Sequence, residues 1–329
     1  MSVVEGDAVQ LVGSLMAGFV DSRCLHVVAN LGMADVVGPE SMPIPDLAAE
    51  LGVHTGSLTR LLRHLVTLGL FSVHGDRVAH NEASRLLRSD HPLGLLETAQ
   101  LMALPIIWDS VRHLEEAVRT GRPGTVFHDP RGFFGYLADH PDESAVYDHG
   151  MTSMTTRRIA EQVPAYDFSR FSVIADIGGG RGHLIRAILD QTPGARGIVF
   201  DQAHVVEGDL AHDRLTVVAG SFFTDPLPEA DCYVLSNIIH DWADDEARAI
   251  LTAVREAAGS DARLLLMEFV VPEGDEGFEA TDIDIDMLIL VGGRERTQRE
   301  YDELLASTGW RLTRTIPTER QTLLEAHPA

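Results

Sequence analysis

The second half of the chain alternates short apolar runs with stretches of helical spacing, and this pattern restricts the fold more than any other feature. From Ser172 onward, seven runs have the length and composition of β-strands: SVIADIG, GIVFD, LTVVAGS, DCYVLSNII, RLLLMEFVV, WRLTRTI and QTLLEAH. Strands that alternate with helices are typical of a mostly parallel sheet with helices on both faces. The pattern therefore predicts an α/β fold for residues 171–329.

The first four of these predicted strands end in polar or glycine-rich segments. In a sheet of this kind, ligands bind beyond the carboxyl ends of the strands. Four segments should therefore lie together on one rim: residues 176–182, Asp201, residues 220–221 and residues 236–240. We expect a ligand crevice at this rim.

The first 100 residues have a different, mainly helical pattern with one short hairpin. A short helix ends at Gly52, and a second begins near Thr55 with leucines on one stripe at positions 58, 61, 62 and 65. The run FSVHGDRVAH then predicts a β-hairpin. Helix, turn, helix and wing together predict a winged-helix module.

A winged-helix module raises the hypothesis of a DNA-binding, ligand-sensing regulator. Residues 46–91 contain five arginines and five acidic residues, so this region is neutral. A protein that reads DNA needs a basic face. We therefore expect a structural, dimerising role for the module, with the regulator as the alternative.

Charge and cysteine content narrow the classes of partner. Over 329 residues, 50 acidic against 26 basic side chains give a net charge of −24, which repels nucleic acids and anionic membranes but not a small neutral or cationic ligand. Cys24 and Cys232 form neither a disulfide framework nor a zinc motif, which fits a reducing cytoplasm. The acidic N-terminus does not resemble a signal peptide, and no uninterrupted apolar run reaches the roughly 18 residues of a membrane span.

The segment ADIGGGRGH follows the first predicted strand and opens a helix. Its glycines let the backbone approach a ligand closely, since no Cβ intervenes. A dinucleotide motif would need a glycine where His183 stands, and no phosphate-binding lysine follows the run. Asp201, at the end of the next strand, suits the two hydroxyls of a ribose. These residues predict a nucleoside site without a phosphate cradle, and the alternative is a plain glycine turn beside a strand-end acid.

Six motifs recur in the same order in S-adenosylmethionine-dependent O-methyltransferases: DIGGGRG, VFDQAHVV, AGSFF, NIIHDW, MEFVVPEG and GGRERTQREYDELLASTGW. Over essentially its whole length the chain resembles bacterial members of the family that includes plant caffeate and flavonoid O-methyltransferases and bacterial polyketide and phenazine ones. The resemblance implies a winged-helix dimerisation domain (1–100), a helical linker that contributes to the acceptor pocket (101–170) and a Rossmann-like class I methyltransferase domain (171–329). It also implies a homodimer, S-adenosylmethionine as cofactor and an aromatic hydroxyl of a secondary metabolite as methyl acceptor.

The resemblance assigns several cofactor contacts residue by residue. The backbone of the glycine run, at Gly178 and Gly180, matches the contact with the cofactor's amino acid part. Asp201 matches the acid that binds the ribose.

Two cofactor positions depart from the plant pattern. Ser221 stands where plant members have an aspartate, and Phe222 follows it as the apolar residue that packs on adenine. Ser236 stands where plant members have a lysine, so the resemblance implies a hydroxyl contact in place of a salt bridge to the cofactor carboxylate.

The predicted catalytic base is His240, and the resemblance places Glu268 and Glu295 on either side of it. A phenol, with a pKa near ~10, is a poor nucleophile until its proton leaves, and a neutral imidazole within hydrogen-bond reach can take that proton. A carboxylate on the far ring nitrogen would fix the tautomer and stabilise the imidazolium. The alternative is that His240 is a polar turn residue. Asp241, an acid just before a helix, is expected to be structural.

Several residues are candidates for the acceptor pocket. Met151 matches a methionine that lines this pocket in relatives, although it could equally be helix core. Trp108, Phe133 and Asn237 are further candidates.

The segment TDIDIDM resembles a metal-binding run, because hard cations prefer carboxylate oxygens. On a helix, however, Asp282 and Asp286 share a face that Asp284 does not. We interpret the three as solvated acids at a helix start, with Asp286 toward the acceptor, and expect no metal.

One further alternative keeps the family but changes the reaction. Some members could carry out C-methylation or cofactor-assisted hydroxylation or cyclisation instead. A diverted member would usually lose the histidine or one of the two glutamates, and this chain has all three.

Overall fold

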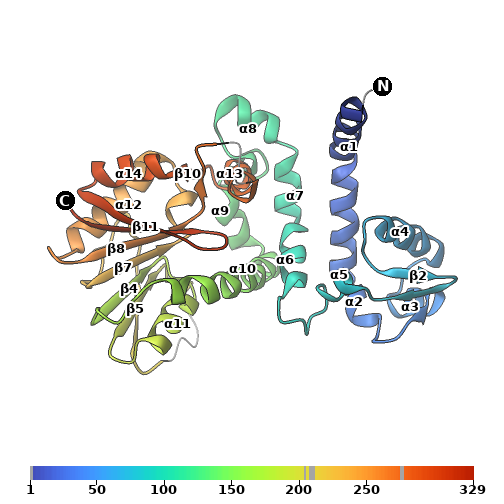
Figure 1. Ribbon diagram of the computed structural model, residues 1–329, viewed down its shortest axis with the longest axis horizontal. Helices are drawn as coiled ribbons and strands as arrows, with labels where there is room; N and C mark the ends of the chain where they lie inside the picture. Colours follow the sequence, from blue (N-terminus) through green and yellow to red (C-terminus); the bar gives the residue numbers. More distant parts are fainter. Residues whose placement is uncertain (1–2, 204, 207–211, 275–277) are drawn as a thin grey trace. The chain divides into compact units, whose positions relative to one another are not determined.

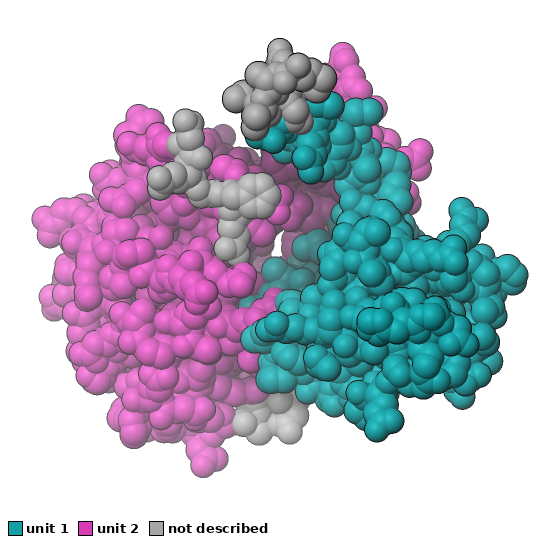
Figure 2. Space-filling model, turned by 45° about the vertical axis from the view of Figure 1, so that its right-hand side comes forward, with its two compact units in different colours: residues 1–108, 140–154 teal, residues 109–139, 155–329 magenta. Residues whose placement is uncertain are grey.

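The computed structural model of the chain describes residues 3–203, 205–206, 212–274 and 278–329 (Figure 1). The chain folds into two compact units, residues 1–108 with 140–154 and residues 109–139 with 155–329 (Figure 2). Helices α7 (Pro105–Val111) and α10 (Pro141–Gln162) contribute residues to both units. Each unit has its own buried core, and each is described by itself.

The first unit contains the expected winged-helix module. Helices α3 and α4 are followed by the β2–β3 hairpin, and β1 pairs antiparallel with β3. The helix, turn, helix and wing predicted from the sequence are therefore confirmed. Its elements are α1 (Val3–Asn30), α2 (Met33–Val36), β1 (Met42–Pro43), α3 (Ile44–Glu50), α4 (Thr55–Thr67), β2 (Ser72–His74), β3 (Arg77–Ala79), α5 (Glu82–Arg85) and α6 (Leu95–Met102).

Local sequence signals explain how this module forms. Gly52 adopts a φ of 65°, which ends α3, and the side chain of His54 accepts a hydrogen bond from the Ser57 N–H at the start of α4. Leu62 and Leu65 of α4 are completely buried, because their spacing puts both on the face that meets the unit's core.

Helix α1 leaves much of its apolar surface uncovered. Seven large apolar side chains on it are 42–73% exposed: Val9, Leu11, Val12, Leu15, Met16, Phe19 and Val20. By length and composition alone, its stretch Asp7–Asn30 is also apolar enough to cross a membrane, although no uninterrupted apolar run had indicated this. A contiguous apolar face of this size is typical of an interaction surface.

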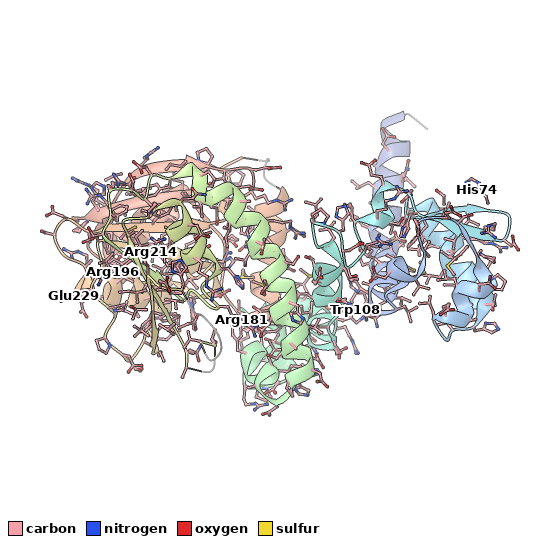
Figure 3. The ribbon with its side chains drawn as sticks, turned by 90° about the horizontal axis from the view of Figure 1, so that it is seen from below. His74, Trp108, Arg181, Arg196, Arg214 and Glu229 are labelled. Atoms are coloured by element: carbon pink, nitrogen blue, oxygen red, sulfur yellow. The ribbon has the colours of Figure 1, made fainter. Side chains whose placement is uncertain are left out.

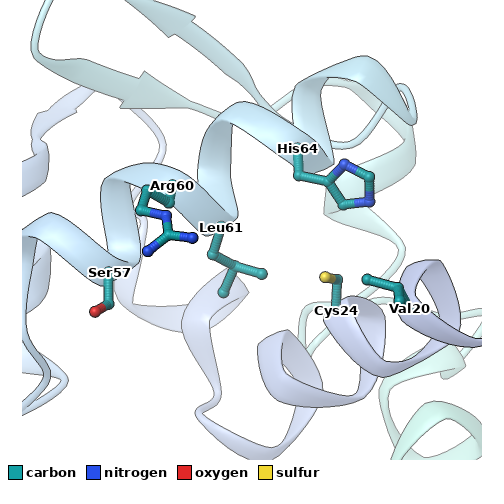
Figure 4. A pocket seen from close by; sticks show the side chains of 6 residues that line it. All are labelled: Val20, Cys24, Ser57, Arg60, Leu61 and His64. Atoms are coloured by element: carbon teal, nitrogen blue, oxygen red, sulfur yellow. The ribbon is translucent and has the colours of Figure 1, made fainter.

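An open hollow of about 350 Å³ lies between α1 and α4 (Figure 4). Cys24, Arg60 and Leu61 are among its lining residues. Burial raises the pKa of the Cys24 thiol, and the nearby Asp21 adds to this effect, so the thiol stays protonated and is a poor nucleophile. The hollow continues the uncovered face of α1 at Val20.

The second unit is built on a seven-stranded sheet with the order β11-β12-β8-β7-β4-β5-β6. Strands β4 to β8 run parallel in this sheet, while β11 and β12 are antiparallel. All seven predicted strands are confirmed. They are β4 (Val173–Ile177), β5 (Arg196–Asp201), β6 (Leu215–Ala219), β7 (Cys232–Ser236), β8 (Arg263–Glu268), β11 (Trp310–Pro317) and β12 (Thr322–Pro328).

Helices cover both faces of this sheet (Figure 1). Apolar residues of α12 and α14 form the core on one face, and those of α11 form it on the other. The central strands are therefore buried on both sides, which explains their continuous apolar runs. The remaining elements are α8 (Leu114–Thr120), η1 (Gly124–Phe127), α9 (Gly132–Asp139), η2 (Val163–Ala165), α11 (His183–Gln191), η3 (Ile239–Asp241), α12 (Asp244–Ala257), β9 (Val270–Val271), α13 (Phe278–Leu290), β10 (Arg296–Thr297) and α14 (Gln298–Ser307).

The strand order reverses between β4 and β7, and this point fixes the place of the crevice. The chain runs outward from β4 to β5 and β6, then returns to add β7 on the other side of β4. Ligands of open α/β sheets bind at such a point, beyond the carboxyl ends of the strands. A Cβ on Gly178, after β4, would lie only 2.4 Å from Ile238 Cδ1, after β7. The segments after β4 and β7 therefore meet at one rim, as predicted.

Candidate active site

The glycine run after β4 forms a turn that meets Asp201 at the end of β5. Gly178 and Gly180 have φ angles of 72° and 56°, a region that glycine adopts without strain. The Gly180 N–H donates to Asp201 Oδ2 at 2.8 Å, and the Gln202 N–H donates to Asp201 Oδ1 at 2.7 Å. Nothing lies within 4 Å of the place where a Gly180 Cβ would stand, so the backbone is open on that side.

Asp176, near the end of β4, is the first residue of the predicted rim segment 176–182, and no role was predicted for it. It is 2% exposed, and its Oδ2 atom has no hydrogen-bond partner among the described residues. A Cβ on Gly179 would lie 2.7 Å from that atom, so only glycine fits there. Burial, with the Asp201 carboxylate nearby, raises the pKa of Asp176 to about 7. The turn, which also carries Arg181 (Figure 3), thus has two carboxyl groups at its base, and a cationic ligand beside them would favour their ionised forms.

The two serines of the predicted cofactor site lie at the carboxyl ends of β6 and β7, which are separated in the sheet by β4 and β5. Ser221 follows β6, and its N–H donates to Asp225 Oδ2 at 2.8 Å. Phe222 packs edge-on against Trp242, with 5.8 Å between the ring centroids. Ser236 is the last residue of β7, and its hydroxyl makes no hydrogen bond to the described residues.

His240 lies in the short helix η3 beyond β7 and is only 6% exposed. Its Nδ1 atom is 2.6 Å from Glu295 Oε1 and 4.0 Å from Glu268 Oε2. Its Nε2 atom is 3.5 Å from Asp241 Oδ1. The structure therefore brings the predicted trio together, with Glu295 as the direct partner, and gives Asp241 a place beside the second ring nitrogen.

Two neighbouring segments fix the backbone of η3. Glu268 Oε1 accepts hydrogen bonds from the N–H groups of Ile238 and Ile239, at 3.2 Å and 2.9 Å. On the other side, the Arg294 N–H donates to the His240 carbonyl at 2.8 Å. A Cβ on Gly293 would lie 2.0 Å from the same carbonyl oxygen. Gly293 is thus required for this close approach.

Asp284 corrects one expectation from the sequence. The three acids of TDIDIDM were expected to be solvated at a helix start, but α13 begins at Phe278, so they lie within the helix. Asp284 Oδ1 accepts a hydrogen bond from the Glu295 N–H at 2.8 Å. This acid therefore faces the site and fixes the backbone of the histidine's partner.

The carboxylates around His240 raise the pKa of its imidazole. Burial disfavours the imidazolium, but the three carboxylate neighbours outweigh burial and raise the pKa of His240 to about 9. Burial raises the pKa of Glu268, because His240 offsets its desolvation only in part. Burial also raises the pKa of Asp241.

The trio consists of residue types that also bind metals, and their ligand atoms lie within 4.8 Å of one another. However, two ligands of one zinc ion, each about 2.1 Å from it, lie roughly 3.4 Å apart. The 2.6 Å between His240 Nδ1 and Glu295 Oε1 is instead a hydrogen-bond distance. This distance suits a hydrogen-bonded pair of the two side chains.

The predicted acceptor residues fall into both units. Asn237 has a φ of 54°, unusual for a residue other than glycine, and its Oδ1 accepts a hydrogen bond from Gln321. Phe133 is buried in α9. Asp286, in α13, has its pKa raised to about 6 by burial and by Asp282. The other two residues, Met151 and Trp108, belong to the first unit.

Within the first unit, Trp108 (Figure 3) packs against α1. The ring of His26 meets it edge-on at 5.5 Å, and the Arg23 guanidinium lies 5.5 Å from its centroid. Met151 is partly buried in α10.

Comparison with known proteins decides the family. The profile of the O-methyltransferase dimerisation domain matches residues 14–90, and that of the O-methyltransferase domain matches residues 111–311. The chain belongs to the O-methyltransferase family. The phenazine O-methyltransferase PhzM of Lysobacter antibioticus is 36% identical to this methyltransferase over 95% of the chain and 94% of its own length.

Solved structures of similar proteins support the same family assignment. The mitomycin 7-O-methyltransferase MmcR has a TM-score of 0.93 at 30% identity, covering 99% of each chain. NcsB1, from neocarzinostatin biosynthesis, was solved with S-adenosylmethionine and 2-hydroxy-5-methyl naphthoic acid. It has a TM-score of 0.81 at 31% identity, covering 94% of this chain and 96% of that one. The predicted Rossmann-like fold is confirmed, and this methyltransferase uses S-adenosylmethionine.

Replacing Asp201 with alanine should weaken binding of S-adenosylhomocysteine about 10-fold or more, since a hydrogen bond to a charged group contributes roughly 1.5–3 kcal/mol. Calorimetry measures the two affinities directly. Asp213→Ala, which removes an exposed acid before the start of β6, is the matched control and should change nothing. Equal affinity in the Asp201 variant and the wild type would remove Asp201 from the cofactor site.

Proposed function

We propose that this O-methyltransferase transfers a methyl group to a phenolic hydroxyl of a small aromatic secondary metabolite, with His240 as the general base. The observation that supports this most is the buried 2.6 Å pair of His240 and Glu295 at the carboxyl end of β7, beside the glycine run. Phenazine, mitomycin and naphthoate chemistry among the similar proteins favours a fused aromatic acceptor.

The cofactor's place is proposed from the strand ends. S-adenosylmethionine supplies a methyl group on a positively charged sulfur. Gly178 and Gly180 would hold its amino acid part, and Asp201 would bind its ribose hydroxyls. Ser221, Phe222 and the hydroxyl of Ser236 would complete the site, with Phe222 against the adenine.

Glu295 gives His240 the tautomer that a base needs. If Nδ1–H donates to Glu295 Oε1, then Nε2 carries the free electron pair that accepts a proton. As the phenol's O–H bond breaks, its proton moves to Nε2 and its oxygen forms the new bond to the methyl carbon. The C–S bond breaks at the same time and leaves S-adenosylhomocysteine, and Glu295 stabilises the imidazolium.

The raised pKa of His240 adds a condition to this scheme. With a pKa of about 9, the ligand-free imidazole is mostly protonated at neutral pH. One proton must therefore leave the site before methyl transfer, and the base strength then matches that of a phenol closely.

We propose four residues as contacts of the methyl acceptor. Asn237 and Asp286 would contact polar groups of the acceptor, while Met151 and Trp108 would line its apolar walls. The helical linker, residues 101–170, would contribute to this pocket. A metal is not required by this scheme.

We propose that two copies form a dimer through residues 1–100, which include the uncovered face of α1 and the hollow beside it. The dimerisation-domain match supports this, as do the seven exposed apolar side chains of α1. We also infer a cytoplasmic enzyme, in keeping with two unpaired cysteines, and no nucleic acid or membrane partner.

The dimer should bury well over ~2,000 Å², as obligate interfaces do. Light scattering at micromolar concentration should give the mass of two chains, and Leu15→Glu with Phe19→Glu should shift the protein toward one chain. A wild-type monomer under the same conditions would contradict the proposal. Retention on DNA at physiological salt would favour the regulator alternative.

The function is tested by incubating the protein with S-adenosylmethionine and a panel of phenols, and by measuring S-adenosylhomocysteine and the methylated product. O-methylation of a fused aromatic phenol is expected. Products with a methyl group on carbon, or with a new hydroxyl group or ring, would instead support the diverted chemistry.

A further inference from the structure

Two buried carboxyl groups flank His240, and they are held in different ways. Glu268 is 0% exposed and Glu295 is 2% exposed. Glu295 Oε1 lies 2.6 Å from the histidine Nδ1, whereas Glu268 Oε2 lies 4.0 Å from it. Only Glu295 is therefore in hydrogen-bond contact with the ring.

The hydrogen bonds of Glu268 account for only one of its oxygens. Oε1 accepts from the N–H groups of Ile238 and Ile239, but Oε2 has no donor among the described residues. Glu295 Oε2 likewise has no partner there. A charged oxygen that is buried without a donor is costly, whereas a protonated one is itself a donor and needs only an acceptor.

Burial favours the neutral form of Glu268, and the carboxyl groups of Glu295 and Asp241 add to this effect, while the His240 imidazolium opposes it. His240 and Asp241 face it from η3, Glu295 from the segment before β10 and Tyr301 from α14. Burial keeps the Tyr301 phenol neutral, since it raises the pKa well above the usual value. Among these groups, only His240 can carry a positive charge. It would have to balance three carboxyl groups, those of Glu268, Glu295 and Asp241.

Arg296 is close by but already engaged. Its guanidinium donates to Asp244 Oδ1 at 2.8 Å and to the backbone carbonyls of Ile239 and Trp242, at 3.1 Å and 2.9 Å. It therefore fixes the η3 segment and pairs with Asp244. It does not neutralise the two glutamates.

We propose that Glu268 is a neutral carboxylic acid in the resting enzyme and that its O–H points toward Glu295, so that the buried pair carries one negative charge. Oxygens of the two groups lie within 4.8 Å of each other, a separation that one bridging water can span. Like charges in one buried site commonly share a single proton in this way.

This state makes Glu268 a positioning residue that acts through His240. Its Oε1 atom holds the η3 turn, while its proton leaves Glu295 as the charged partner of the imidazolium. The inference rests on the proposed function for the role of His240, but the protonation of Glu268 can be measured without turnover.

The test is the isosteric change Glu268→Gln, with the pH dependence of kcat/KM as its readout. A neutral acid and an amide present the same charge, so the midpoint of the profile should stay where it is in the wild type. If Glu268 were ionised, losing a charge 4.0 Å from Nδ1 would lower the midpoint by about one to three units and overturn the proposal.

Infrared spectroscopy gives a second readout. The wild type at neutral pH should show the C=O band of a protonated carboxyl that disappears in Glu268→Gln. Glu325→Gln is the matched control, because Glu325 is also buried but pairs with Arg170 at 2.8 Å and is ionised. A wild-type spectrum without a band that depends on Glu268 would also overturn the proposal. A wild type that methylates no phenol would instead contradict the proposed function and leave the infrared result to decide on Glu268.

Discussion

Replacing His240 with alanine is expected to lower turnover by ~10²–10⁴-fold, the usual contribution of a positioned acid–base group. Without the imidazole, the phenol keeps its proton at neutral pH and its oxygen is a weak nucleophile. The affinity for S-adenosylhomocysteine should hardly change, because the proposed cofactor contacts at Gly178 and Asp201 lie on other segments. Steady-state methyl transfer gives the first quantity, and calorimetry gives the second.

A second histidine serves as the control for this variant. His327, on β12, is partly buried and pairs with Glu325 at 3.3 Å. His327→Ala should therefore keep wild-type turnover. If His240→Ala also kept it at neutral pH, the histidine would be a polar turn residue, methyl transfer would rest on proximity alone, and the diverted chemistry would become the better account.

Raising the pH from 7 to 9 is expected to increase kcat/KM for a phenol acceptor about 50-fold. The base works only when it is deprotonated, and its pKa is raised to about 9. Below that value the neutral fraction falls tenfold per pH unit, from one half at pH 9 to about one hundredth at pH 7. Activity should therefore rise with pH and level off above 9.

The cause of this pH dependence can be tested with Glu295→Gln. Losing the carboxylate 2.6 Å from Nδ1 removes a charge that favours the imidazolium, so the midpoint should move down toward that of a free histidine. Turnover should also fall, because the amide stabilises the imidazolium less well. A wild-type profile that is already level below pH 7.5 would contradict the raised pKa.

The parts of the fold that the sequence predicts depend on local patterns. The strands that become β4, β5, β7 and β8 are continuous apolar runs, because helices cover the sheet on both faces. The winged-helix module follows from helical leucine spacing and from a short hairpin. His240 could be placed because a core strand ends in a histidine at the rim of the sheet.

The parts that the sequence did not predict depend on contacts between distant segments. Nothing near Asp284 indicates that it accepts the Glu295 N–H from eleven residues away. The contact of Asn237 with Gln321 spans 84 residues. The unequal distances from His240 to the two glutamates also arise only when β8 and the segment before β10 pack around η3.

Two signals in the sequence could have predicted parts of these contacts. The glycine pair before Arg294 marks a close approach of two backbones, and the structure shows that Gly293 meets the His240 carbonyl. Asp176 interrupts an apolar strand directly before the glycine run, which indicates a buried acid at the crevice.

The central claim is that His240 removes the acceptor's proton, and the ratio of wild-type to His240→Ala turnover across phenols of different acidity tests it most directly. With a phenol of pKa near ~10, the ratio should be ~10²–10⁴ at neutral pH. With a phenol that is already ionised at that pH, the variant should recover, and the ratio should fall to within about tenfold, because no proton remains to be removed. A ratio that stays the same for acidic and weakly acidic phenols would contradict the account.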